Sequence, residues 1–419
     1  MSKQVSEAAS RLEQFFDQGS FVEIDRLMRD GDSPVPVVGG YGLVNDAPVY
    51  AFAQDRTVCN GAVGKAQAAK IKTIYRLAAQ NGAPVVGLFD SDGARLGDGL
   101  DAMDAIADIL ASANELSGVV PQLAVVLGAC VGSSALIASA ADVVIAAKDA
   151  DYYLNVGDEN GKADVSADSV EDAIAKAREL LSYLPSNNLA AAPLFETVEA
   201  AAASKDDVVS LLADADSVFA LYEDEVAAFA RIGGAPCGIV TLKGEPISCC
   251  AASRAARFMR LCDSFSLPVI TIVDATGFKG LTCASKLTQA YAEATTAKIT
   301  VVTGAAYGPV YIAVAGKFAG SDAVLAWPDA SIAPLAPETA IHIVWKDRLA
   351  EMNDPKSDRK ALAEEYRKTC CNADLAAAQG AVTDVVAPED TRARVAGLLE
   401  MLSGKRVSKL PKKHANIRL

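Results

Sequence analysis

The stretch AAKIKTIYRLAAQNGAPVVGLFDSDGARL, residues 68–96, is matched by ASRAARFMRLCDSFSLPVITIVDATGFKG, residues 252–280. Each stretch begins with an amphipathic helical segment, continues after a proline into an apolar run, and ends that run in an aspartate, Asp90 or Asp274. Similarity within one chain over such a length is typical of an internal repeat. The chain is therefore predicted to consist of two copies of one fold.

The repeat extends to both sides of these stretches. Residues 44–55, VNDAPVYAFAQD, resemble residues 231–244, RIGGAPCGIVTLKG, and residues 125–150 resemble residues 301–330. Each half is thus predicted to contain an edge hairpin, an amphipathic helix, an apolar strand, a second helix, a second apolar strand and a glycine turn into a further helix. Alternation of helices with apolar strands indicates an α/β fold with right-handed crossovers.

The apolar strands of the two halves, PVVGLFD (84–90) and PVITIVD (268–274), are rich in Val and Ile and show no alternation. Such a run is expected for a parallel strand that is covered on both faces. Prolines and small residues in LPSNNLAAAP, residues 184–193, indicate a linker. We expect two domains, 1–190 and 191–419, each within the usual domain range of about 50–250 residues.

Composition restricts the class of protein. The formal net charge of −14 argues against a nucleic-acid surface, which needs clustered Lys and Arg. The basic tail, residues 405–418, is expected to be solvated or to meet an acidic partner surface. The nine cysteines form no CxxC pair and there are two histidines, so a zinc site is not supported. Because a secretory signal is not evident, no disulfide framework is expected and a cytoplasmic location is predicted.

Residues 117–147 contain a single charged residue, Asp142, over a length that could span a bilayer. Pro121, Gly128 and Gly132 interrupt this segment. A buried strand, a tight turn and a helix are therefore favoured over membrane insertion.

A glycine turn follows the last apolar strand in each half: LGACVGSS, residues 127–134, and TGAAYGPV, residues 303–310. The stretch after each turn is rich in Ala and can be helical, and a helix N-terminus directs unpaired backbone N–H groups outward. Two such donors, fixed in a dry site, would stabilise the negative oxygen of a thioester that is becoming an enolate. Alternatively, Gly132 and Gly308 only permit tight packing between strand and helix.

Side chains near the first turn offer few other catalytic groups. Cys130 has no histidine near it in the sequence to act as a base, so a nucleophilic role is not favoured. Asp90, Asp92 and Asp98 could pair as acid and base or bind a metal, but their spacing matches no metal loop, and aspartates at strand ends commonly cap turns. Arg95 is a candidate for contact with a coenzyme A phosphate or thioester.

Several stretches recur in a fixed order along the chain: YAFAQD, GAPVVGLFDSDGAR, GACVG, LLSYLPSNN, PVITIVDATGF, LAWPDA and KLPKKHANIRL. These stretches resemble the carboxyltransferase family, represented by the β chain of propionyl-CoA carboxylase and the α subunits of biotin-dependent decarboxylases. The resemblance extends from Leu12 to Leu419. It implies two tandem crotonase-like domains of the ββα spiral type, related by internal duplication.

The resemblance implies a carboxyltransferase subunit of a biotin-dependent acyl-CoA carboxylase or decarboxylase, which moves a carboxyl group between carboxybiotin and a short-chain acyl-CoA. Domain 1–190 would bind acyl-CoA and domain 191–419 biotin, with each active site formed between opposite domains of two subunits, commonly in a hexamer. The chain has no MKM biotinylation signature and no ATP-grasp domain, so biotin is expected on a separate carrier protein. A biotin carboxylase or a membrane decarboxylase subunit is the further expected partner.

By the same resemblance, the catalytic groups are backbone amides. Those of Gly132 and Ser133 would bind the thioester oxygen, and those of Gly308 and Val310 the ureido oxygen of carboxybiotin. The other expected substrate-binding residues are Gly61, Gly93, Ala94, Arg95 and Ile312, the last of which would line the acyl pocket.

Some features depart from the family pattern. Pro309, in the second turn, has no N–H. The glycine-rich loop that seats biotin is shortened to KGLTCASK, residues 279–286, the substrate-lining segment 155–169 is also short, and Asp92 stands where the family usually has a glycine. These departures support an alternative, in which the chain is a catalytically degenerate structural or regulatory paralogue. A crotonase-type hydratase or thioesterase would instead need an acidic or hydroxyl group at the first turn.

Overall fold

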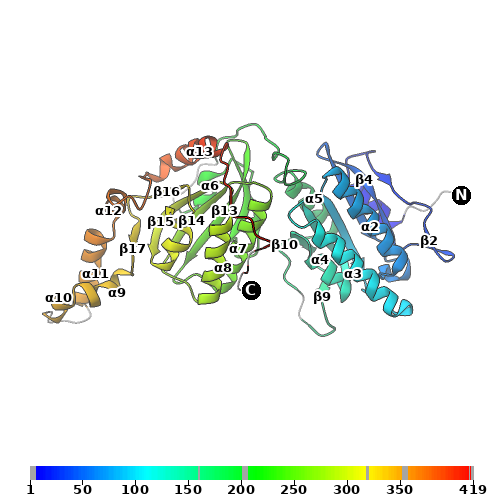
Figure 1. The fold of residues 1–419 in the computed structure, drawn as a ribbon, viewed down its shortest axis with the longest axis horizontal. Helices are drawn as coiled ribbons and strands as arrows, with labels where there is room; N and C mark the ends of the chain where they lie inside the picture. Colours follow the sequence, from blue (N-terminus) through cyan, green and yellow to red (C-terminus); the bar gives the residue numbers. More distant parts are fainter. Residues whose placement is uncertain are drawn as a thin grey trace. The chain divides into compact units, whose positions relative to one another are not determined.

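The computed structural model describes residues 6–158, 161–200, 206–317, 320–351, 357–414 and 416. Two compact units divide the chain, Met1–Pro193 and Leu194–Leu419. The division falls at the end of the segment LPSNNLAAAP, in which the sequence predicts a linker. Figure 1 shows that each unit consists of a sheet with helices packed on it.

The first unit contains a sheet of eight described strands. Their order across the sheet is β1 (Val22–Glu23), β4 (Val37–Val44), β5 (Ala47–Gln54), β6 (Val85–Ser91), β7 (Gln122–Val131), β8 (Val143–Ala147) and β10 (Val165–Ala167), with β9 (Asp151–Tyr153) paired to β7. Strands β1, β4 and β5 are antiparallel neighbours, and β5 to β10 run parallel. A separate pair, β2 (Arg29–Asp30) and β3 (Ser33–Pro34), lies outside this sheet.

The second unit repeats this order strand by strand. Its described strands are β11 (Phe219–Leu221), β12 (Ala227–Ile232), β13 (Ala235–Gly244), β14 (Val269–Ala275), β15 (Lys298–Tyr307), β16 (Ala323–Ala326) and β18 (Asp384–Val385), with β17 (Ser331–Ala333) paired to β15. The register shifts at matching places, between Phe89 and Ser91 in the first sheet and between Val273 and Ala275 in the second. The predicted internal repeat and the α/β fold class are confirmed.

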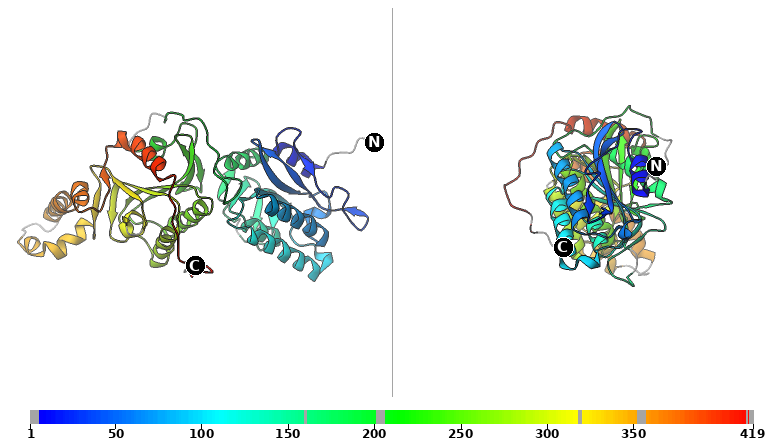
Figure 2. Two further views of the ribbon diagram at one scale, coloured as in Figure 1. Left: turned by 45° about the horizontal axis from the view of Figure 1, so that its top comes forward. Right: turned by 90° about the vertical axis from the view of Figure 1, so that its right-hand side faces the viewer.

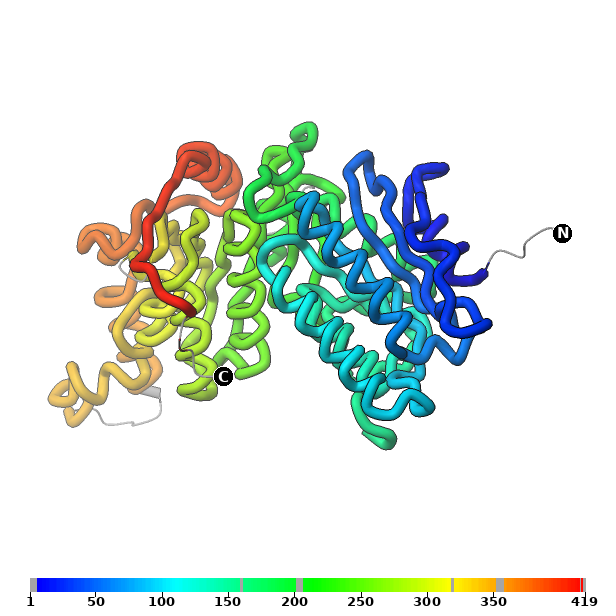
Figure 3. Tube along the Cα trace, turned by 45° about the vertical axis from the view of Figure 1, so that its right-hand side comes forward, coloured from blue at the N-terminus to red at the C-terminus, as the bar shows by residue number. Residues whose placement is uncertain are grey.

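Helices cover the sheet of each unit, and Figures 2 and 3 show this layering from other directions. In the first unit α2 (Lys65–Asn81) packs beside α3 (Leu100–Glu115), and in the second α7 (Cys249–Ser264) packs beside α8 (Leu281–Glu293). The remaining described α-helices are α1 (Glu7–Phe15), α4 (Ser133–Ser139), α5 (Val170–Leu181), α6 (Val208–Leu212), α9 (Pro337–Val344), α10 (Lys346–Ala350), α11 (Ser357–Cys370), α12 (Ala373–Ala378) and α13 (Thr391–Leu402).

Helix α2 shows why the sequence is helical between β5 and β6. Its buried residues Ile71, Ile74, Tyr75 and Ala78 have the spacing of one helical face. Gly82 ends the helix in the left-handed conformation (φ 60°), and its N–H donates to the Ala78 carbonyl. A residue without a Cβ adopts this conformation at little cost, so the helix ends where the sequence places its glycine.

Strand β6 is buried along its whole length, and β14 is buried except at Asp274. Both strands therefore have the two covered faces that their unbroken apolar runs predict. The apolar segment 117–147 contains β7, α4 and β8, as favoured over membrane insertion. In the described part of the chain no helix has the length and apolar character needed to cross a membrane.

Lysines of the basic tail contact its own unit, while residues 406–414 are exposed to solvent as expected. The Lys405 Nζ lies 2.8 Å from the Asp322 carboxylate, and the Lys409 Nζ donates to the Ala292 carbonyl at 2.8 Å. Lys412 forms an ion pair with Glu293. The described part of the tail is thus attached to the C-terminal end of α8 and to the loop before β16.

A disulfide joins Cys249 to Cys283, whose Cα atoms are 5.2 Å apart. The sequence analysis did not predict this bond, which forms no framework because the other seven cysteines are free. The two cysteines lie in the first turns of α7 and α8. Both helices follow parallel strands and so begin at the same edge of the sheet, which brings together residues that are 34 positions apart.

Lys298, the first residue of β15, is a buried cation with 2% of its surface exposed. Its Nζ donates to the carbonyl oxygens of Tyr291 (2.5 Å) and Ala294 (2.8 Å), which belong to the C-terminal end of α8 and have no partner further along the helix. Burial, with the nearby charge of Lys405 as a smaller cause, lowers the pKa of Lys298 to about 8. Lys298 therefore caps the C-terminal end of α8, although burial disfavours the charged form of its ammonium group.

We expect the free energy of unfolding, compared with that of a Lys298→Met variant, to rise between pH 8 and pH 10.5. An unfolded lysine keeps its proton up to its ordinary pKa of 10.5, whereas the folded lysine releases it near 8. The unfolded state then binds more protons in this window, so stability increases with pH. The gain over the variant should be about 1–3 kcal/mol, measured by urea unfolding at several pH values. A difference that stays constant across the window would contradict the assignment.

Candidate active site

Asp90, at the end of β6, fixes the course of β7. Its carboxylate accepts a hydrogen bond from the Ala129 N–H at 3.2 Å, and a Cβ at Gly128 would lie 2.5 Å from the same carboxylate. Up to Val126 strand β7 pairs with β8, and from Ala129 onward it pairs with β9. The carboxylate therefore lies where β7 changes partner, just before the first glycine turn.

Asp274 has the same place in the second unit. Its carboxylate accepts a hydrogen bond from the Ala305 N–H at 2.8 Å, and a Cβ at Gly304 would overlap with it. Strand β15 changes partner from β16 to β17 at this point. The two glycine turns are thus positioned by equivalent contacts.

The two aspartates differ in their surroundings. Asp90 is buried, and its carboxylate lies 2.8 Å from an Arg11 nitrogen and 3.4 Å from an Arg56 nitrogen. Asp274 is exposed and forms no ion pair with any residue that the structure describes. The sequence analysis did not identify the two arginines, because α1 and the loop after β5 are distant from Asp90 in the sequence. The carboxylate next to the first turn, Asp90, is therefore compensated by arginines, whereas the carboxylate next to the second turn, Asp274, is exposed to solvent.

Gly132 begins the first turn with φ 57° and ψ −126°, a conformation that residues with a Cβ avoid. Its N–H donates to the Tyr153 carbonyl at 3.0 Å, so this amide is already engaged. Ser133 is the first residue of α4, and its N–H has no acceptor within the helix. The sequence analysis assigned both amides to the site, and this assignment stays a prediction; of the two, the Ser133 N–H is the one without a partner in its own helix.

A second donor comes from the segment after β6. The Val63 N–H donates to the Gly93 carbonyl (2.7 Å) and the Arg95 N–H donates to the Val63 carbonyl (3.0 Å), so the Ala94 N–H points away from Val63. Gly93 has φ 92°, and a Cβ there would lie 3.7 Å from the Ser133 nitrogen. The Ala94 segment therefore passes close to the start of α4, which makes the Ala94 and Ser133 N–H groups the candidate pair of oxyanion donors.

Three successive residues with positive φ support this segment: Cys59 (49°), Asn60 (52°) and Gly61 (67°). A Cβ at Gly61 would overlap with the Asp90 carbonyl, and the Asn60 carbonyl accepts a hydrogen bond from the Asp92 N–H at 3.2 Å. Positive φ at residues other than glycine is strained and is concentrated at functional sites. Gly61 thus acts by permitting close packing beneath the Ala94 segment.

Arg95 is engaged by carboxylates of its own unit. Its guanidinium forms an ion pair with Asp30 and another with Asp98 at 3.2 Å. The hydrogen bond with Asp30 raises the pKa of Arg95. Contact between Arg95 and coenzyme A stays a prediction, and it would require the guanidinium to share or exchange these partners.

The second turn has fewer available donors than the first. The Gly308 N–H donates to the Ala333 carbonyl at 2.9 Å, as Gly132 does to its own neighbouring strand. Pro309 directly follows, in the place of Ser133, and has no N–H. Val310 keeps its amide but is completely buried. The sequence analysis assigned Gly308 and Val310 to biotin, and this assignment stays a prediction.

Phe278 supplies the donor that corresponds to Ala94. The Ile247 N–H donates to the Gly277 carbonyl (2.9 Å) and the Lys279 N–H donates to the Ile247 carbonyl (2.9 Å), which repeats the pattern of the first unit. The sequence analysis did not identify Phe278. The internal repeat could have identified it, because the alignment that pairs Asp90 with Asp274 also pairs Ala94 with Phe278.

Two further candidate residues lie outside the donor groups. Ile312 is on the short π-helix η3 (Tyr311–Ala315) of the second unit and is 62% exposed, so its place in an acyl pocket stays a prediction. Cys130 is buried, and burial raises the pKa of its thiol to about 12. The thiol is therefore protonated near neutral pH and is not an activated nucleophile.

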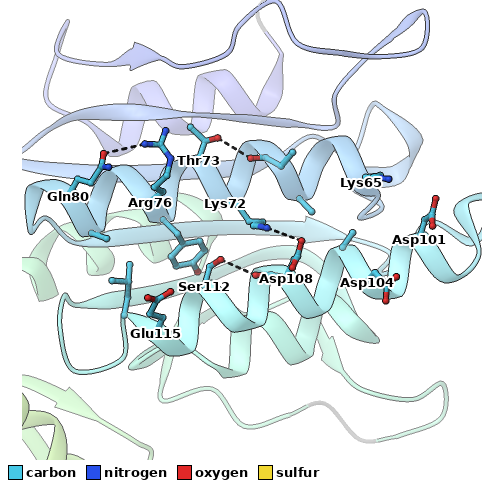
Figure 4. A pocket seen from close by; sticks show the side chains of 16 residues that line it. Lys65, Lys72, Thr73, Arg76, Gln80, Asp101, Asp104, Asp108, Ser112 and Glu115 are labelled. Atoms are coloured by element: carbon cyan, nitrogen blue, oxygen red, sulfur yellow. Dashed lines mark hydrogen bonds and ion pairs between the residues drawn. The ribbon is translucent and has the colours of Figure 1, made fainter.

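A groove of about 700 Å³ lies between α2 and α3 (Figure 4). Its α2 wall contributes the cations Lys65, Lys72 and Arg76, and its α3 wall contributes the carboxylates Asp101, Asp104, Asp108 and Glu115. Lys72 and Asp108 join the walls at 2.8 Å. The positive charges of one wall nearly balance the negative charges of the other. Ion pairs across the groove are therefore better suited to holding α2 against α3 than to binding an ionic substrate. Within the described ranges no group of three or more His, Cys, Asp or Glu side chains could hold a metal ion.

Comparison with known proteins identifies the family. The carboxyl transferase domain matches residues 5–157 and 153–417. The chain belongs to the carboxyl transferase family, which confirms the resemblance found in its sequence.

Similar proteins cover nearly the whole chain. Methylmalonyl-CoA decarboxylase subunit alpha of Propionigenium modestum is 34% identical and covers 98% of this chain and 93% of its own length. The carboxyltransferase subunit of propionyl-CoA carboxylase from Haloferax mediterranei is 33% identical with the same coverage. The crystal structure of transcarboxylase 12S with hydrolysed methylmalonyl-CoA has a TM-score of 0.89 and 30% identity, over 98% of this chain and 92% of that chain. The predicted fold of two crotonase-like domains is confirmed.

Gly128→Ala should lower the free energy of unfolding by about 2–4 kcal/mol, because its Cβ would displace a carboxylate that is buried and held by two arginines. Gly304→Ala should cost less, since the exposed Asp274 can move aside. Denaturant unfolding of both variants measures the difference.

Gly97→Ala is the matched control, because a Cβ at Gly97 meets nothing within 4 Å. It should change stability by less than about 0.5 kcal/mol. Equal losses for all three variants would show that the carboxylate contacts do not position the turns.

Proposed function

We propose that the protein is the carboxyltransferase subunit of a biotin-dependent acyl-CoA carboxylase or decarboxylase, which moves a carboxyl group between carboxybiotin and a short-chain acyl-CoA. The observation that carries this proposal is the pair of backbone donors, Ala94 and Ser133, at a turn where Asp90 is neutralised and the Cys130 thiol is protonated. Relatives named for methylmalonyl-CoA and propionyl-CoA support the substrate class.

The first unit is the acyl-CoA side in this proposal. The thioester oxygen accepts hydrogen bonds from Ala94 and Ser133, and these bonds strengthen as negative charge develops on the oxygen. The donors are held by backbone contacts of Gly93 and by the start of α4, so they need no reorganisation during the reaction. The amides thereby lower the energy of the enolate that gains or loses the carboxyl group.

The second unit is the biotin side. Biotin belongs to a separate carrier protein and, when bound, supplies the carboxyl group and a basic nitrogen. Phe278 offers a donor for its ureido oxygen, equivalent to Ala94, and the position equivalent to Ser133 is Pro309. The second turn can therefore hold biotin, but it offers the ureido oxygen one backbone donor fewer than the first turn offers the thioester oxygen.

A second candidate function follows from Pro309 and the burial of Val310. A chain with a complete thioester side and an incomplete biotin side would serve as a structural or regulatory subunit of a larger carboxylase. A hydratase or thioesterase is less well supported. Ser133 has a hydroxyl group, but the nearby Asp90 carboxylate is buried between two arginines and is poorly placed to act as a base.

The proposal extends to assembly and partners. Transcarboxylase 12S is described as a hexamer, and we propose a homo- or hetero-oligomer, with a hexamer as the expected form. The proposed partners are the biotin carrier protein and either a biotin carboxylase or a membrane decarboxylase subunit. The second possibility is supported by a relative that is named as the alpha subunit of a methylmalonyl-CoA decarboxylase. The proposed location is the cytoplasm.

Carboxyl transfer tests the function directly. The purified protein is incubated either with methylmalonyl-CoA and free biotin or a biotinylated carrier protein, or with acetyl- or propionyl-CoA and the carboxylated carrier protein. The acyl-CoA and biotin products are then measured. Transfer supports the enzyme, and acyl-CoA binding without transfer supports the degenerate subunit. Failure to bind any acyl-CoA would contradict both.

Ser133→Pro should lower the rate of carboxyl transfer by about 10²–10³-fold, because it removes one oxyanion donor. Proline is accepted at the first position of a helix, as Pro309 shows at the equivalent place, so the melting temperature should change little. Steady-state kinetics and thermal unfolding measure the two effects.

Ser133→Ala is the control, since it keeps the amide and removes the hydroxyl group. It should retain most of the wild-type rate. If Ser133→Ala is as slow as Ser133→Pro, the hydroxyl group and not the amide is the catalytic group.

Pro309→Ser should increase the rate of transfer to or from biotin, by up to about 10²–10³-fold, because it restores the donor missing from the second turn. The variant should lose about 0.4–1 kcal/mol of stability through the greater freedom of its unfolded chain. Transfer rates are compared at saturating acyl-CoA. An efficient wild type that this substitution leaves unchanged would show that Phe278 is sufficient.

A further inference from the structure

Arg56 connects the two aspartates at the end of β6. Its Nη1 lies 3.4 Å from the Asp90 carboxylate and its Nη2 lies 3.0 Å from the Asp92 carboxylate. The Asp90 side chain is buried, whereas those of Arg56 and Asp92 are 44% and 40% exposed. The Arg56–Asp92 ion pair therefore lies at the surface beside the first turn.

This ion pair is close to the proposed thioester donor. Asp92 comes directly before Gly93 and Ala94 in the chain, and its N–H donates to the Asn60 carbonyl at 3.2 Å. Its side chain is held by Arg56 on the exposed side of this segment. Asp92 is two residues before Ala94, so its carboxylate is close enough to act electrostatically on an anionic ligand bound at the Ala94 N–H.

Each carboxylate of this cluster has an arginine partner. Asp90 has a second partner, Arg11, at 2.8 Å, which also pairs with the exposed Glu7 at 2.6 Å. Arg56 is therefore the cation paired with Asp92. Removal of Arg56 would leave the Asp92 carboxylate uncompensated at the rim of the turn. An acyl-CoA carries several phosphate charges, and like charges within about 10 Å repel one another at low ionic strength.

We propose that Arg56 is a charge-compensating residue for acyl-CoA binding: it neutralises Asp92 and so lets an anionic thioester reach the first turn. The inference rests on the proposed acyl-CoA function and concerns a residue that acts through Asp92.

Binding of propionyl-CoA, measured by calorimetry with the full chain at low and high salt, tests the proposal. Arg56→Gln should weaken binding by about 3- to 10-fold at low salt and by less at high salt, because salt screens the exposed carboxylate. Asp92→Asn should have the opposite effect and strengthen binding, since it leaves the Arg56 charge unopposed. The double variant should return close to the wild-type affinity.

The opposite signs separate charge compensation from a structural role. A structural ion pair would weaken binding in both single variants, and that result would overturn the proposal. Arg76→Gln is the matched control, because Arg76 is an exposed arginine on α2 with a hydrogen bond to Gln80 (3.2 Å). Equal affinities for Arg56→Gln and Arg76→Gln would also overturn the proposal.

Two further outcomes keep the test decisive. If Arg56→Gln does not fold, Arg56→Lys keeps the charge and Asp92→Asn alone still gives the sign. Stronger binding by Asp92→Asn at low salt supports the proposal, and unchanged or weaker binding overturns it. If the wild type does not bind propionyl-CoA or any other acyl-CoA, the proposed function itself fails, and this result is distinct from a failure confined to the Arg56 variants.

Discussion

A hydrogen bond from the backbone of one strand to the aspartate at the end of its neighbour is the contact on which each half of the molecule depends. Asp90 and Asp274 each accept a backbone N–H of the adjacent strand at the point where that strand changes partner. Because the carboxylate occupies the space of a side chain, the residue facing it must be glycine. The bend then directs the chain into the following turn and helix. The location of both proposed binding sites follows from this single contact.

Most of the architecture could be predicted from the sequence because it depends on local patterns. The unbroken apolar run of β6 and the helical spacing of Ile71, Ile74 and Ala78 are visible in the letters. The internal repeat supplied the topology, since one copy supports the interpretation of the other.

The details of the site depend on partners that no local pattern identifies. The Gly132 amide is engaged by Tyr153, whose strand β9 is three residues long and has no periodicity to recognise. Arg11 and Arg56 come from segments far from Asp90 in the sequence. For the same reason the sequence could not separate Gly132 from Ser133 as donors, and it did not include the Ala94 amide among the oxyanion donors.

The two halves have kept their backbone contacts while their side chains have diverged. The Val63–Ala94 bridge and the Ile247–Phe278 bridge have the same hydrogen-bond pattern. Backbone contacts constrain side chains little, so a duplicated unit can lose a donor, as at Pro309, and still fold. The fold is therefore a weaker guide to activity in this family than the amides at each turn.

The attachment of the C-terminal tail has a consequence for handling the protein. Lys298, Lys409 and Lys412 all reach the last turn of α8, and the first turn of that helix lies two residues after Lys279 in the donor segment. A tag or fusion partner placed after residue 414 would therefore stand near α8, the helix that follows the Phe278 segment. The position of such a tag matters for carrier-protein assays, because it would lie on the unit of the proposed biotin side.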